Sequence, residues 1–99
     1  MRVSLIVHDA LRDLIRGLSL HLKSSVRRAL DDILKEPLTG KPLSEELEEL
    51  RSYKIGRFRV IYRVEGPVVT LIAIGPRQII YQKLSLDIKH QLERQKGRK

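Results

Sequence analysis

The spacing of apolar residues predicts one short strand and two helices in the first third of the chain. Residues 3–7 (VSLIV) are apolar at nearly every position, as in a short strand that is covered on both faces. Asp9 can cap a helix over residues 10–17. Over residues 20–35 the apolar side chains recur every three or four positions, on one face of a second helix that ends before Pro37. We expect the two helices to form an antiparallel hairpin.

The second half of the chain has the pattern of strands. Residues 36–43 (EPLTGKPL) indicate a loop, and residues 44–51 predict one or two helical turns that begin at Ser44. From Tyr53 the period is two, with Phe58, Val60, Tyr62 and Val64 on one face and Arg57, Arg59, Ile61 and Arg63 on the other.

A turn and two further elements complete the pattern. The sequence Glu-Gly-Pro at residues 65–67 predicts a turn, and residues 68–74 predict a buried strand. The spacing of Leu84, Ile88 and Leu92 predicts a C-terminal helix. This order predicts a single α+β domain over residues 1–99. Two N-terminal helices pack on one face of a mostly antiparallel sheet of about four strands, and the other face is left for function.

Composition restricts the kind of partner. The 99 residues carry a net charge of +8, which favours a polyanion or an acidic protein. The absence of cysteine excludes disulfides and thiolate metal sites and fits the cytoplasm. No stretch approaches the roughly 18 apolar residues of a membrane span, and the three histidines have no carboxylate at metal-ligand spacing. We therefore expect no membrane partner, metal or cofactor.

The candidate chemistry lies in residues 52–64 and 71–81, where basic residues and tyrosines gather. Metal-independent RNA cleavage uses the 2′-OH as nucleophile and needs a base, an acid and cations for the phosphate. Arginine offers phosphate a two-pronged set of donors, and lysine offers a compact charge. Arg57 and Arg63 lie in the first of these stretches and are candidate RNA contacts, and Lys83, just after the second, is a further candidate RNA contact.

Two motifs resemble a known family. Residues 53–62 (YKIGRFRVIY) and 74–81 (IGPRQIIY), together with the helix pair and Leu43, resemble the RelE/ParE superfamily of type II toxin–antitoxin toxins. The RelE-like branch implies a toxin that cleaves mRNA codons in the ribosomal A site and is neutralised by a cognate antitoxin. An antitoxin segment that is acidic would suit the charge of this chain, and contact with DNA would come through the toxin–antitoxin complex.

The resemblance also implies roles for four residues. Arg59 and Arg77 would contact the scissile phosphate, and Lys54 would act as base or stabilise charge. Tyr81 would stack on a base or donate a proton. At Gly56 the chain lacks a second lysine that strongly cleaving RelE-like enzymes often carry. Two alternatives therefore stay open: a ParE-like inhibitor of DNA gyrase without RNase activity, and a degenerate toxin that acts mainly as co-repressor with its antitoxin.

Overall fold

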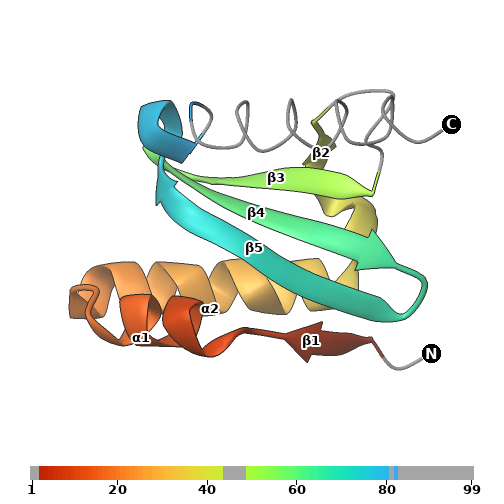
Figure 1. The fold of residues 1–99 in the computed structure, drawn as a ribbon, viewed down its shortest axis with the longest axis horizontal. Coiled ribbons are helices and arrows are strands. Elements are labelled where there is room, and N and C mark those ends of the chain that lie inside the picture. Colours follow the sequence, from red (N-terminus) through yellow and green to blue (C-terminus); the bar gives the residue numbers. More distant parts are fainter. Residues whose placement is uncertain (1–2, 44–48, 81, 83–99) are drawn as a thin grey trace, which may run out of the picture.

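The fold is a five-stranded sheet with two helices along one face (Figure 1). The computed structural model describes residues 3–43, 49–80 and 82. The elements in chain order are β1 (Ser4–Ile6), α1 (Asp9–Arg16), α2 (Leu20–Lys35), the single 3₁₀ turn η1 (Pro37–Thr39), β2 (Lys41–Pro42), β3 (Leu50–Ile55), β4 (Phe58–Glu65) and β5 (Val68–Pro76). Residues 77–80 continue directly from β5 as a helical segment.

The sheet has the order β1-β5-β4-β3-β2. Strands β2 to β5 form an antiparallel meander, and β1 joins the edge of the sheet in parallel with β5, with Ser4 opposite Val68. The α+β class and the mostly antiparallel sheet are confirmed, with one strand more than expected. Strand β2, which has two residues, lies within the segment expected to be a loop. The stretch from residue 53 to 64, for which no internal turn was expected, is divided between β3 and β4, and Arg57 lies in the turn and not on a strand face.

The helices lie where the apolar pattern places them. Helix α2 spans the predicted residues, and the Oγ atom of Ser19 accepts a hydrogen bond from the backbone N–H of Leu22 at 3.3 Å. The predicted cap of α1 is wrong by one residue. His8 occupies the N-cap position without a side-chain cap bond, and Asp9 is the first helical residue. A carboxylate in the first turn still interacts favourably with the helix dipole.

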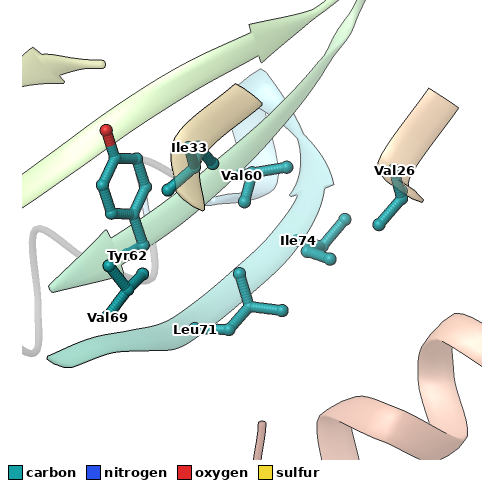
Figure 2. Packing of buried hydrophobic residues seen from close by; sticks show 7 residues of the cluster. All are labelled: Val26, Ile33, Val60, Tyr62, Val69, Leu71 and Ile74. Carbon is teal, nitrogen blue, oxygen red and sulfur yellow. The ribbon is translucent and has the colours of Figure 1, made fainter. Parts of the chain in front are cut away.

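The main core lies between α2 and the sheet. Val26 and Ile33 from α2 meet buried residues of the two long strands β4 and β5 (Figure 2). These strand residues are Val60, Tyr62, Val69, Leu71 and Ile74. A smaller cluster on the opposite face of the sheet contains Ile61 and Ile80. The expectation that Tyr62 is a core residue is confirmed, since its relative exposure is 0%.

Two sequence expectations concern segments that are only partly described. The helical turns expected over residues 44–51 do not extend to Leu50 and Arg51, which begin β3. Residues 44–48 and the C-terminal helix expected around Leu84, Ile88 and Leu92 lie outside the described residues. Within the described ranges, no helix combines the length and the apolar character that crossing a membrane requires.

Candidate functional site

A row of basic residues crosses the face of the sheet that points away from the helices. Lys54 on β3 lies directly opposite Arg59 on β4, and Arg59 lies opposite Gly75 on β5. Neighbouring residues Val60 and Tyr62 belong to the core, so the alternation of the strand puts Arg59 on the other face. Like charges directly opposite each other destabilise a sheet. The pairing of Lys54 with Arg59 therefore lowers the stability of the sheet, and a bound anion would offset this effect.

The β3–β4 hairpin turn holds the arginine in place. The turn consists of Gly56 and Arg57, and Gly56 has a φ of 55°, a conformation that glycine adopts without strain. One terminal N–H group of Arg59, at Nη1, is within hydrogen-bond distance of the carbonyls of Gly56 (3.2 Å) and Phe58 (3.1 Å). The backbone N–H of Arg77 donates to the carbonyl of Arg57 at 3.1 Å. The hairpin therefore supports the basic residues on both sides of it.

Two adjoining hollows lie over this row. The first, of about 470 Å³, is lined by Lys54, Gly56, Arg57, Arg59, Pro76, Arg77 and Gln78. The second, of about 450 Å³, is lined by Thr39, Gly40, Lys41, Ser52, Tyr53, Lys54, Arg59 and Arg77. Because both share Lys54, Arg59 and Arg77, we call them together the basic groove.

The groove lacks compensating acids in the described part of the chain. The ion pairs found there join Arg16 to Asp13 and Arg63 to Glu65, each at 3.8 Å. Neither Lys54 nor Arg59 forms an ion pair with another described residue. A surface with this charge attracts phosphate-bearing ligands.

The structure brings most, but not all, of the predicted site residues together. Lys54, Arg57, Arg59 and Arg77 line the basic groove. Arg63 lines neither of its hollows and instead lies beside Glu65. Tyr81 and Lys83 lie outside the described residues.

Sequence reasoning did not identify several residues that line the groove. These are Thr39, Gly40, Lys41, Ser52, Tyr53, Pro76 and Gln78. Ser52 could have been found, since it is two positions before Lys54 on the same strand and so shares its face. Lys41 gave no such signal, because a two-residue strand shows no periodicity.

A buried tyrosine fixes the segment that forms the far wall of the groove. The hydroxyl of Tyr62 donates to the carbonyl of Pro37 at 2.7 Å and accepts from the N–H of Gly40 at 2.9 Å. Burial raises the pKa of Tyr62 above its ordinary value, so the hydroxyl stays protonated at neutral pH. A Cβ atom on Gly40 would lie 2.6 Å from the Tyr62 oxygen, which explains the glycine.

Arg51 adds a second attachment to the same segment. Its Nη1 group donates to the carbonyl of Gly40 at 2.8 Å and to that of Leu38 at 3.2 Å. Together with the Tyr62 hydroxyl, these bonds satisfy the carbonyls of Pro37 and Leu38 and both backbone groups of Gly40. The chain before β2 is therefore tied to the sheet.

A further hydrogen bond joins α2 to β3 beside the groove. The hydroxyl of Tyr53 donates to Oδ2 of Asp32 at 2.7 Å. The hydrogen bond to Asp32, followed by burial, raises the pKa of Tyr53 above its ordinary value of 10.0. Tyr53 lines the groove next to Lys54, so this bond positions the strand that carries the lysine.

Comparison with known proteins identifies the family. Residues 6–81 match the family described as the ParE toxin of the type II toxin–antitoxin system parDE. The chain is 35% identical over 77 residues to toxin RelG of Mycobacterium tuberculosis, a match that covers 75% of this chain and 88% of that toxin.

Solved structures share the fold. The toxin–antitoxin complex RelBE2 of Mycobacterium tuberculosis contains a chain with a TM-score of 0.64 and 26% identity, covering 78% of this chain and 100% of that one. The isolated RelE toxin of E. coli has a TM-score of 0.64 at 19% identity, covering 87% and 98%, which shows likeness of fold. The α+β arrangement is thus a RelE-like fold. The chain therefore belongs to the RelE/ParE family of toxins of type II toxin–antitoxin systems.

Proposed function

We propose that this toxin is a RelE-type mRNA interferase, an endoribonuclease that cleaves codons in the ribosomal A site. The observation that supports this most is the basic groove, in which Lys54, Arg59 and Arg77 line both hollows. The identity with a toxin named RelG supports the RelE-like branch. Lys54 and Arg59 are direct cross-strand partners, so one phosphate group can contact both cations at once.

The reaction follows from the chemistry of RNA. The 2′-oxygen attacks the adjacent phosphorus while its proton leaves to a base. The bond from phosphorus to the 5′-oxygen then breaks, and that oxygen takes a proton. The products are a 2′,3′-cyclic phosphate and a 5′-hydroxyl end, and all atoms come from the RNA itself. The protein has to supply proton transfer and positive charge around the phosphate.

The groove residues fit these tasks. Arg59 has five N–H donors, and the hairpin carbonyls occupy only one terminal nitrogen, Nη1. The rest of its guanidinium can bind a phosphate oxygen, with Arg77 on a second oxygen. Lys54, directly opposite Arg59, accepts the 2′-OH proton or stabilises the charge. Tyr81 keeps its expected role in base stacking or proton transfer, and Arg57 and Lys83 contact the RNA beyond the cleaved bond.

The first prediction concerns Arg77. Changing Arg77→Ala should lower mRNA cleavage by about a hundredfold or more, because each preorganised donor to a charged transition state contributes about that factor. Arg77 is exposed, so the unfolding transition should stay close to that of the wild type. The measurement is primer extension on a translated mRNA soon after induction of the toxin without antitoxin.

Arg12→Ala is the matched control. Arg12 is an exposed residue of α1, and the change removes the same single charge. New 5′ ends within codons should appear with the wild type and with Arg12→Ala and should disappear with Arg77→Ala. Undiminished cleavage by a folded Arg77→Ala toxin would refute the role of the groove.

A second candidate function has one specific observation in its favour. The matching family is described as a ParE toxin, and the ParE-like branch implies inhibition of DNA gyrase without RNA cleavage. In that case induced cells would filament and accumulate DNA breaks while their mRNA stayed intact. The primer-extension experiment separates the two candidates, because only an interferase creates new 5′ ends.

The proposed activity also defines the partners. The toxin works in the cytoplasm on the ribosome and its mRNA. We propose that a cognate antitoxin with an acidic toxin-binding segment neutralises it, as the net charge of +8 favours. A toxin–antitoxin complex of RelBE2 exists among the structural relatives. Contact with DNA would come through the antitoxin.

A further inference from the structure

We infer that Lys41 and the second hollow form a subsite for the backbone phosphate next to the one that is cleaved. This inference rests on the proposed function, since it gives the same RNA a second contact. Lys41 lies on β2 and lines the second hollow together with Lys54, Arg59 and Arg77. Sequence analysis did not single it out.

The register of the sheet determines where Lys41 lies. Lys41 is the direct partner of Ser52 on β3, and Lys54 is two residues further along the same strand. Lys41 and Lys54 are therefore diagonal neighbours, with Cα atoms about 7–8 Å apart. Residues paired in this way share one face of the sheet. One RNA strand bound at Lys54 and Arg59 can therefore reach Lys41 with a neighbouring phosphate.

Charge supports the same conclusion. Lys41 is exposed and forms no ion pair with another residue in the described ranges. A third cation placed diagonally from a like-charged pair adds repulsion that nothing nearby in those ranges offsets. An extended polyanion with charges at regular intervals offsets it along the whole row.

The way in which the β2 segment is held indicates that Lys41 does more than protect the edge of the sheet. Lysines on sheet edges often serve to prevent pairing with other strands, a task that needs no fixed conformation. Here the segment just before Lys41 is held by the buried hydroxyl of Tyr62 and by Arg51. Position 40 has no space for a side chain, because a Cβ atom there would lie too close to that hydroxyl. Lys41 therefore stands in a defined place at the wall of the hollow, as a binding residue requires.

The first test measures cleavage on ribosomes with a programmed A-site codon. The single-turnover rate is recorded against toxin concentration for the wild type, Lys41→Ala, Lys41→Arg and Arg12→Ala. Lys41→Ala should raise the half-saturating concentration about tenfold, as expected for loss of a hydrogen-bonded charge. Lys41→Arg should restore most of this loss, and Arg12→Ala should resemble the wild type.

Chemically altered mRNA locates the contact. A single uncharged methylphosphonate linkage is placed on either side of the scissile phosphate. At one of the two positions the linkage should lower cleavage by the wild type as much as Lys41→Ala does. At that position it should not lower cleavage by Lys41→Ala any further. The inference would be overturned if the effects of the linkage and of Lys41→Ala on cleavage were fully additive at both positions. Cleavage by Lys41→Ala that equals cleavage by Arg12→Ala would also overturn it.

A binding experiment keeps the inference testable if the wild type cleaves nothing. Affinity for a short single-stranded RNA is measured at several salt concentrations. The slope of log K against log salt should fall by about 0.7 in Lys41→Ala, the value for one lost phosphate contact on a single strand. An unchanged slope contradicts the subsite, whereas absent cleavage with a reduced slope contradicts only the proposed catalysis.

Discussion

At the scale of single residues, the groove gathers charge at the expense of stability. Lys54 and Arg59 are direct cross-strand partners on the solvent face, and neither forms an ion pair with a carboxylate among the described residues. Such a pair is destabilising until an anion lies between the two charges. The sheet bears this cost because the core on its other face is completely buried, with Val60 and Tyr62 at 0% exposure.

Lys54→Gln should separate stability from activity. Removing the repulsion with Arg59 should raise the free energy of unfolding by about 0.2–0.5 kcal/mol. The gain should shrink at high salt because exposed charges are screened. Cleavage should fall at least tenfold. Urea denaturation at two salt concentrations, with Lys54→Arg as the charge-conserving control, measures the first effect; a loss of stability would contradict it.

Single residues also show how far sequence reasoning can reach. Arg59 was predictable without knowledge of the fold, because a period of two puts its side chain on the other face of the strand from Phe58 and Val60. Lys41 was not, because its proximity to Lys54 depends on the register between β2 and β3. The structure explains Gly56 by its backbone conformation. Its φ of 55° closes the hairpin, so a lysine at this position would strain the turn.

At the scale of elements, long periodic segments were predicted best. Helix α2 repeats its apolar stripe over four turns, and its bounds agree with the prediction. Strand β2 and the start of β3, which depend on pairing with neighbouring strands, were not predictable. Strand β2 has two residues, one of them proline, and the first residues of β3 follow a run of glutamates typical of a helix start. Leu50 and Arg51 are strand residues because they pair with Arg63 and Tyr62, a long-range choice that overrides local preference.

The contact between α2 and β3 leads to a prediction on pH. The hydrogen bond to Asp32 raises the pKa of Tyr53 above 10.0, so folding favours the protonated phenol. Its contribution is complete below pH 10 and is lost as pH rises through the raised pKa. The free energy of unfolding of the wild type should exceed that of Tyr53→Phe by about 1 kcal/mol between pH 7 and 9.

That difference should shrink above pH 10, where the phenol of the folded protein ionises. Urea denaturation of both proteins across this range checks the sign. Comparison with Tyr53→Phe cancels the titration of the lysines that both proteins share. A difference that grows with pH would mean that the bond to Asp32 does not set the pKa of Tyr53.

At the scale of the whole molecule, the two faces of the sheet have separate tasks, and β5 joins them. Its core-facing residues Val69, Leu71 and Ile74 meet the helices, and it pairs with both β1 and β4. Directly after it comes Arg77, which lines the groove. The strand therefore connects the packing of the molecule to its candidate chemistry.

Leu71→Ala should consequently affect the whole protein. Leu71 is 1% exposed, and truncation of a buried leucine costs about 2–5 kcal/mol. Leu20→Ala is the matched control, because Leu20 is 82% exposed and its truncation removes no packing. Thermal unfolding of the two variants should differ by several degrees or more. Equal midpoints would show that β5 does not hold the core together.

The parallel pairing of β1 with β5 also determines when a newly made toxin can become active. Synthesis proceeds from the N-terminus, so β1 and both helices leave the ribosome before their partner strand exists. At about 5–20 residues per second they wait for seconds with an uncovered apolar side. The residues of β5 that complete the core and the arginine that completes the groove are then made in direct succession. A newly made chain with the proposed activity therefore cannot become active before the residues of β5 and Arg77 have been made.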